Sequence, residues 1–181
     1  DAALEIRSRG VDPAQIESIE LGVPSPVLRT IAQPAEAKAR PESGYHAAFS
    51  GPYTVAAALT GGGGLGLGHE DFTDAAAADE ERLALAAKVT CVADARADEI
   101  FPHQFPAVLT VRLADGTEQQ ARVDVNRGGP GNPLTSEELA TKFTFNAEAV
   151  LDPAAAQELS RAVLALPGAD GLGPVMEMVR R

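Results

Sequence analysis

The sequence predicts an α+β fold, a two-layer α/β sandwich with a mainly antiparallel sheet of about four strands, followed by a C-terminal helical segment. Residues 106–113 and 118–125 alternate between apolar and polar side chains around an Asp-Gly turn, which predicts a β-hairpin. Two β-branched stretches, 16–23 and 88–93, bring the expected strands to four. Beyond residue 133 only helical patterns follow, so no strand is expected there.

The composition bounds the size and excludes some classes of protein. The 181 residues are enough for one domain with a hydrophobic core, or for one domain with an extension. The net charge of −11 argues against a sequence-independent nucleic-acid binder and against an anionic membrane surface as a partner. No apolar run reaches the roughly 18 residues of a membrane span, and the chain does not open on a secretory signal. We therefore expect a cytoplasmic protein.

The first residues form part of a helical pattern that Gly10 ends. The chain begins at Asp1 within this pattern, without an initiator Met, which favours a fragment of a longer protein. After the strand at 16–23, a short helix is expected at 27–32, and residues 33–44 are expected to form a loop.

Several local signals predict the remaining elements. Acidic residues at the start of 79–87 suit a helix N-terminus because they complement the helix dipole. Thr135 and Glu138 form a capping-box pattern, and Asp152 before a proline predicts the start of another helix. A last helical turn is expected at 175–181. In the hairpin, three side chains are expected on one face of the sheet, namely Ala121, Val123 and Val125.

Residues 47–61 are the stretch around which the chain is organised. Their small apolar residues predict a buried helix from about Pro52 to Thr60, which Gly61 ends. The glycine-rich run 61–68 follows a helix and lacks the lysine of a phosphate loop, so it is expected to be a flexible surface loop. The one large polar group of the helix is the phenol of Tyr53, and taken alone it favours a buried tyrosine bonded to the backbone.

Three stretches carry recognisable patterns in collinear order. Residues 47–59 fit A-x-F-S-x-x-Y-x-V-A-x-A-L, and residues 127–135 with Lys142 and Phe143 fit R-G-x-P-x-N-P-L-(S/T) … K-F. Residues 11–20 are similar to G-L-x-P-x-x-I-x-x-I. Over residues 1 to about 150 the chain thus resembles the MmgE/PrpD family. That family includes 2-methylcitrate dehydratase of propionate catabolism, cis-aconitate decarboxylase and iminodisuccinate epimerase.

The resemblance implies a division of the chain into two parts. Residues 1–128 would form the smaller α+β lid domain of the family, and residues 129–181 a C-terminal helical segment. The helical segment would pack on an all-helical N-terminal domain that this chain lacks, whether as a removed part or as a separate chain. A homodimer is also expected.

The resemblance further implies a reaction and a site. The family abstracts a proton next to a carboxylate of a small di- or tricarboxylic acid, then loses water or carbon dioxide or returns the proton on the other face. Tyr53 matches the family tyrosine and is the expected catalytic residue, with the buried structural role as the alternative. Ser50, Gly51 and His46 are the expected substrate-binding residues. Ala48 departs from the polar residue that members often carry there.

Other chemistry-bearing residues favour structural roles. His69 and His103 are scattered and are expected on the surface, as is His46 if it does not bind substrate. Because Cys91 is the one cysteine of the sequence, an internal disulfide is excluded, and Cys91 is expected in the core. Neither a metal cluster nor a cofactor motif is present, so no cofactor or metal is expected.

Two functions from different classes therefore stay open. One is the lid part of a lyase or isomerase of the MmgE/PrpD type, inactive without its helical domain. The other is a non-catalytic binding or assembly module that retains the lid fold.

Overall fold

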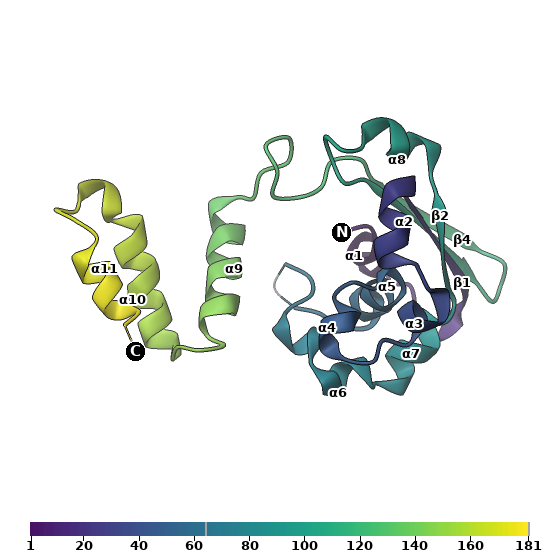
Figure 1. The fold of residues 1–181 in the computed structure, drawn as a ribbon, viewed down its shortest axis with the longest axis horizontal. Helices are drawn as coiled ribbons and strands as arrows, with labels where there is room; N and C mark the ends of the chain where they lie inside the picture. The colour runs from purple at the N-terminus through teal and green to yellow at the C-terminus, as the bar shows by residue number, and fades with distance from the viewer. Residues whose placement is uncertain (64, 181) are drawn as a thin grey trace. The chain divides into compact units, whose positions relative to one another are not determined.

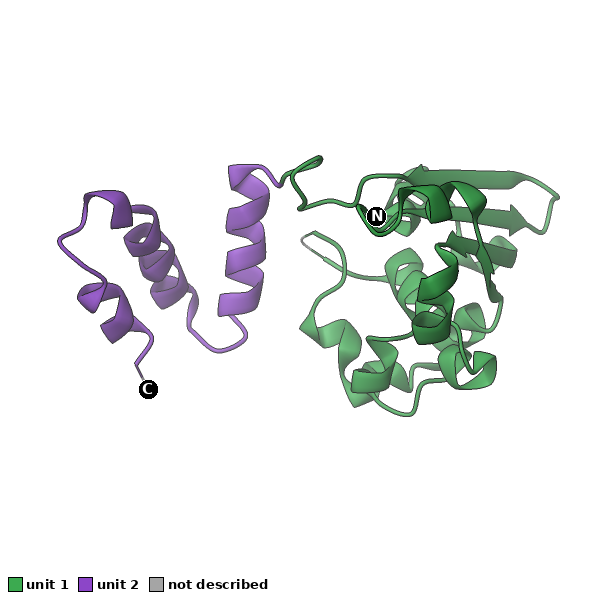
Figure 2. Cartoon of the chain, turned by 45° about the horizontal axis from the view of Figure 1, so that its top comes forward, with its two compact units in different colours: residues 1–133 green, residues 134–181 purple. Residues whose placement is uncertain are grey.

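The structure, a computed structural model, describes residues 1–63 and 65–180. The chain divides into two compact units, Asp1–Pro133 and Leu134–Arg181 (Figure 2). Gly64, one residue of the predicted glycine-rich loop, lies outside the described residues.

The first unit is built on a four-stranded sheet in the order β2-β1-β3-β4. Figure 1 labels β1, β2 and β4 of this sheet. Its strands are β1 (Ile16–Val23), β2 (Val89–Ala93), β3 (Ala107–Leu113) and β4 (Glu118–Val123). β1 runs parallel to β2 and antiparallel to β3, and β3 and β4 form an antiparallel hairpin. This mainly antiparallel sheet with its helices confirms the predicted α+β fold.

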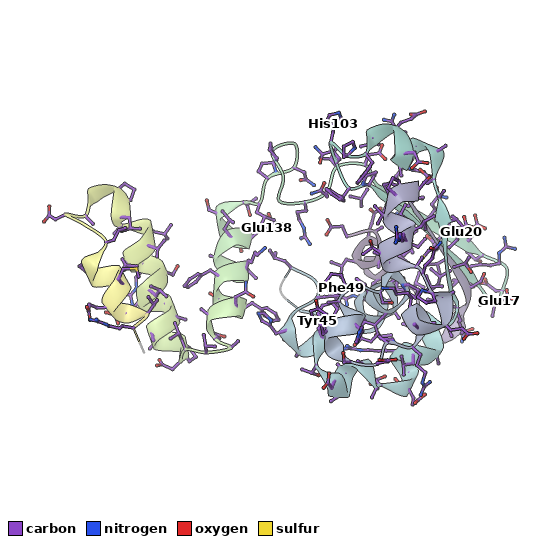
Figure 3. The ribbon with its side chains drawn as sticks, in the orientation of Figure 1. Glu17, Glu20, Tyr45, Phe49, His103 and Glu138 are labelled. Atoms are coloured by element: carbon purple, nitrogen blue, oxygen red, sulfur yellow. The ribbon has the colours of Figure 1, made fainter. Side chains whose placement is uncertain are left out.

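The register of the sheet places apolar side chains on its inner face. Leu21 of β1 pairs with Leu109 of β3, which pairs with Ala121 of β4, and all three are buried. The neighbouring positions Glu20, Thr110 and Gln120 also align across the strands and stay polar. Figure 3 shows Glu20 at the outside of the unit. The period of two in the sequence thus separates core from surface.

Two helices cover the inner face of the sheet. α1 (Ala2–Ser8) and α5 (Gly51–Thr60) pack on it and on each other, and α7 (Glu80–Ala86) packs on the far side of α5. Buried aliphatic side chains from both layers fill the core between them. The described part of the unit also contains five further α-helices and two 3₁₀ turns: α2 (Ser25–Ile31), α3 (Ala35–Ala39), α4 (Gly44–Ala47), α6 (Asp74–Ala77), α8 (Ala95–Ile100), Pro13–Gln15 and His69–Phe72.

Two expectations about local structure are wrong. Residues 33–44 were expected to form a loop, but Ala35–Ala39 form α3, because Ala, Glu and Lys are strong helix formers and Pro34 starts the helix instead of preventing it. β4 ends at Val123, so Val125 lies beyond the strand and is 36% exposed. The predicted turn at Asp115-Gly116 is present, with Gly116 at a φ of 84°.

The second unit contains only helices among its described residues: α9 (Ser136–Ala147), α10 (Pro153–Leu164), a 3₁₀ turn (Leu166–Gly168) and α11 (Gly173–Met178). The capping box that starts α9 is confirmed: Glu138 N–H donates to Thr135 Oγ1 at 3.1 Å, and Thr135 N–H donates to Glu138 Oε2 at 2.8 Å. α10 packs on α9 and on α11. Only Ala156 and Leu159 are buried among the described residues of this unit.

Candidate functional site

Helix α5 is positioned by signals that its own sequence carries. Ser50 is its N-cap and accepts a hydrogen bond from the Tyr53 N–H at 3.0 Å, and Pro52 stands in the first turn, where no N–H is needed. Ala56 and Ala57 are fully buried, because alanine lets the helix approach its neighbours closely. The predicted boundaries of this helix, about 52–60, agree with the structure.

The two sides of α5 face different surroundings. Thr54, Val55 and Ala58 line a cavity between the helix and the sheet. Tyr53 and Ala57 belong instead to a second small core with Leu83 of α7. Tyr53 and Ala57 are four positions apart and share one face of the helix, and neither lines the cavity.

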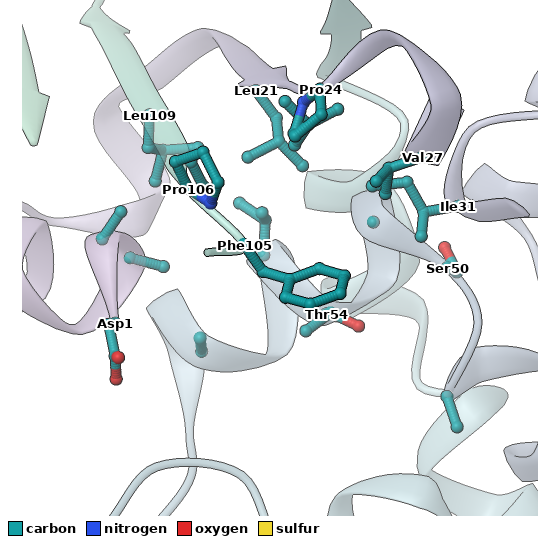
Figure 4. A pocket seen from close by; sticks show the side chains of 18 residues that line it. Asp1, Leu21, Pro24, Val27, Ile31, Ser50, Thr54, Phe105, Pro106 and Leu109 are labelled. Atoms are coloured by element: carbon teal, nitrogen blue, oxygen red, sulfur yellow. The ribbon is translucent and has the colours of Figure 1, made fainter. Parts of the chain in front are cut away.

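The cavity has a volume of about 380 Å³ and is mostly apolar (Figure 4). Figure 4 shows the ring of Phe105, which is 62% exposed, reaching across it near Thr54. The volume falls within the range of small-molecule pockets, about 300–1,000 Å³. The other labelled residues around it are Asp1, Leu21, Pro24, Val27, Ile31, Ser50, Pro106 and Leu109.

Two polar groups of this cavity are already engaged, the carboxylate of Asp1 and the hydroxyl of Ser50. Asp1 is the one residue with a titratable side chain among its described lining residues, and Arg127 Nη2 donates to its Oδ1 at 2.8 Å. Ser50 is 1% exposed and donates its hydroxyl to the Lys38 carbonyl. Gly51 is tightly packed, because an added Cβ would lie 3.2 Å from Ile31 and 3.3 Å from Cys91 Sγ. The side chains of the described lining therefore offer shape and apolar surface, but neither an unpaired carboxylate nor a cation.

Tyr53 lies in the core and is fully buried. Its hydroxyl donates to the Asp71 carbonyl at 2.6 Å and accepts from Arg82 Nη1 at 3.4 Å. The phenol thus has the buried, backbone-bonded arrangement that was the alternative to catalysis. The catalytic role of Tyr53 stays a prediction, and a substrate has no path to the hydroxyl in this conformation.

The bond to Tyr53 belongs to a buried polar cluster. The carboxylate of Asp71 is 2% exposed and accepts from Arg82 Nη2 at 2.9 Å and from the Gly68 N–H at 2.9 Å. Burial alone would lower the pKa of Arg82, but its bonds to Tyr53 and Asp71 outweigh that cost and raise the pKa, so the guanidinium stays charged. A buried ion pair of this kind often marks a functional site.

His46 belongs neither to the lining of the cavity nor to the buried polar cluster. It is exposed on α4, its Nδ1 is 2.9 Å from Ser43 Oγ, and its ring packs edge-on against Tyr45 with centroids 5.9 Å apart. Figure 3 shows the neighbouring Tyr45 and Phe49 on this surface. The structure thus brings Ser50 and Gly51 together at the cavity, but it places Tyr53 in the core and His46 on the surface.

Two residues of the polar cluster were not identified from the sequence. Arg82 precedes Ala86 by four residues and so shares the buried face of α7, and this spacing was a usable signal. Asp71 had no comparable signal, because its burial depends on the turn formed by His69–Phe72. Cys91 lies beside the core as expected, and burial raises the pKa of its thiol to about 11.

Within residues 1–63 and 65–180, no group of three or more His, Cys, Asp and Glu side chains is placed to hold a metal ion. Helices long and apolar enough to cross a bilayer are also absent from this described part.

The fold defines the class of the protein: a two-layer α+β domain with a helical extension. Residues 1–167 match the family model of the MmgE/PrpD C-terminal domain, so the chain belongs to the MmgE/PrpD family. This match confirms the family predicted from the three sequence motifs and the C-terminal portion assigned to the chain. No curated protein matches the chain.

Proposed function

We propose that this chain is the lid part of an MmgE/PrpD-type enzyme that acts on a small di- or tricarboxylic acid in the cytoplasm. The reaction class is proton abstraction next to a carboxylate, which leads to dehydration, decarboxylation or epimerisation. The observation that carries the proposal is the family match over residues 1–167.

The chemistry of the cavity supports a division of labour with a second domain. Proton abstraction needs a base near its working pKa and cations for the substrate carboxylates. The described lining of the cavity contains a single carboxylate, that of Asp1, which Arg127 already binds. An apolar wall without a free base suits one half of a shared active site, so we expect the base to come from an all-helical domain or partner chain.

The alternative is a non-catalytic binding or assembly module. The buried position of Tyr53 favours it, because the one expected catalytic group of this chain is used inside the core. The two functions differ in what the chain needs: an enzyme lid needs a helical partner for turnover, and a module does not turn over with any partner.

Native mass spectrometry after mild purification separates the two functions. The enzyme predicts an assembly that contains an all-helical polypeptide, whether or not the chain also pairs with a second copy of itself. The module predicts a lone monomer or homodimer.

An isotope-exchange assay then tests the reaction class. The isolated chain is expected to leave the carbon-bound protons of 2-methylcitrate unexchanged in D₂O, and the assembly with a helical partner is expected to exchange them. Exchange by the chain alone, at a rate close to that of the assembly, would overturn the division of labour.

A further inference from the structure

Two arginines from different elements meet at one glycine. Arg7 of α1 donates from Nη1 to the Ala58 carbonyl at 3.0 Å and also to the Gly61 carbonyl. Arg82 of α7 approaches the same residue, since its Nη2 lies 2.9 Å from the position that a Cβ on Gly61 would occupy. Glycine at position 61 therefore leaves room for a guanidinium group.

The charges at this point do not cancel. Asp71 is the carboxylate that neutralises Arg82, with Oδ1 at 2.9 Å from Nη2. Arg7 has no ion pair among the described residues, since its described bonds go to two backbone carbonyls. Asp71 thus neutralises Arg82, whereas Arg7 brings a positive charge to the Gly61 carbonyl without an ion-pair partner among the described residues.

Both arginines keep donors for another acceptor. A guanidinium has five N–H donors in a planar fork that matches a carboxylate. Within the described residues, Arg82 donates from Nη1 and Nη2, and Arg7 donates from Nη1 alone. The side chain of Arg82 is 19% exposed and Arg7 is half-buried, so solvent reaches part of each. Partial burial strengthens the attraction for an anion, because water screens the charge less.

We propose that Arg7 and Arg82, which converge on Gly61, form a binding site for a small di- or tricarboxylate. The choice of this ligand class rests on the proposed function. In this arrangement Asp71 and Tyr53 are positioning residues: they hold the guanidinium of Arg82 through Nη2 and Nη1 and leave its remaining donors for the ligand. The hydroxyl of Tyr53 then acts through Arg82, which accounts for a phenol that no substrate reaches.

Citrate binding to the full chain tests the site. Isothermal titration and amide chemical shifts are measured with citrate, and inorganic sulfate serves as the comparison anion. We expect citrate to shift the amide signals around Gly61 and to bind at least about 10-fold more tightly than sulfate. Undetectable citrate binding, or equal binding of sulfate, would overturn the proposed site.

Variants assign the binding to the two arginines. Arg82→Gln and Arg7→Gln are each expected to weaken citrate binding about 10-fold or more, whereas Arg82→Lys is expected to keep part of it. Arg40→Gln is the matched control, because Arg40 is exposed and paired with Glu80. Citrate binding that is unchanged in Arg82→Gln and Arg7→Gln would contradict the proposal.

Two further variants guard against loss of the fold. Arg82→Gln leaves Asp71 buried without its partner, so Asp71→Asn/Arg82→Gln removes both charges, and circular dichroism checks each protein. Gly61→Ala keeps every charge but places a methyl group near Arg82 Nη2, and it is expected to weaken citrate binding as well. The proposed function has a separate readout: if the assembly exchanges 2-methylcitrate protons with an unchanged KM in Arg7→Gln, the site is wrong and the function stands. Citrate binding at Gly61 combined with no proton exchange by the assembly would support the site and overturn the proposed function.

Discussion

At the scale of residues, the phenol of Tyr53 explains how a signature residue is used in this chain. The sequence presents it as the one large polar group of an apolar helix, which favours either catalysis or a buried structural bond. Its hydroxyl links the Asp71 carbonyl to Arg82, so it contributes to the only described ion pair with a carboxylate as little exposed as 2%. The type of residue was predictable from the motif, but its partners lie 18 and 29 positions away and depend on tertiary packing.

Tyr53→Phe removes this hydroxyl and keeps the ring. We expect the free energy of unfolding to fall by about 1–2 kcal/mol, because the buried Asp71 carbonyl and Arg82 each lose a partner. Urea denaturation followed by circular dichroism measures the change. Tyr45→Phe is the control, since Tyr45 is 73% exposed, and an equal loss in both variants would contradict the structural role of Tyr53.

The alkylation rate of the Cys91 thiol tests whether strand β2 is buried in the folded chain. Burial raises the pKa of its thiol from 9.0 to about 11, so the thiolate at pH 8 is about 100-fold scarcer in the folded chain than in the unfolded chain. We expect iodoacetamide to alkylate the folded chain more slowly by at least that factor than the chain in urea, and mass spectrometry follows the reaction. Similar rates in both states would show that β2 does not protect the thiol.

At the scale of elements, the sequence predicts those helices and strands whose formation depends on neighbouring residues. The hairpin β3–β4 follows from alternation and an Asp-Gly turn, and α9 follows from a capping box; both are present. α3 was missed because two prolines outweighed the helix propensity of Ala35–Ala39. The contact between Asp94, the N-cap of α8, and Arg122 of β4 was not predictable, since the two residues are 28 positions apart.

Asp94→Asn tests that contact through its pH dependence. Arg122 donates to both carboxylate oxygens of Asp94, at 3.0 and 2.8 Å, and this bonding lowers the pKa of Asp94 below 3.8. The stabilisation is therefore complete above pH 3.8 and is lost as the pH falls through the lowered pKa. We expect a loss of about 1 kcal/mol at pH 7, because the pair is partly exposed.

The difference between wild type and Asp94→Asn should shrink towards zero as the pH drops below the lowered pKa. Arg122→Gln combined with Asp94→Asn should cost no more at pH 7 than the larger single change. A difference that stays constant down to the acid limit would contradict the ion pair.

At the scale of the whole molecule, the two compact units differ in how much core they contain. Both hydrophobic clusters lie within residues 1–133, whereas the described part of residues 134–181 buries only Ala156 and Leu159. A helical segment with so little buried apolar surface gains most of its stability from surfaces that it packs on. The packing of this segment on an all-helical domain stays a prediction.

Truncation separates the two units. We expect residues 1–133 alone to unfold in one cooperative transition, because their core is complete, and residues 134–181 alone to be largely unstructured in water. Differential scanning calorimetry and circular dichroism measure both pieces. A stable, cooperative 134–181 fragment, or a 1–133 fragment that does not fold, would contradict this division.

The most direct test of the proposed function is exchange of the carbon-bound protons of 2-methylcitrate in D₂O, followed by NMR. It compares the chain alone with the chain supplied with an all-helical domain of an MmgE/PrpD enzyme. The proposed shared active site predicts exchange only when both are present. Exchange by the chain alone, or no exchange from a native assembly shown to contain both parts, would contradict it.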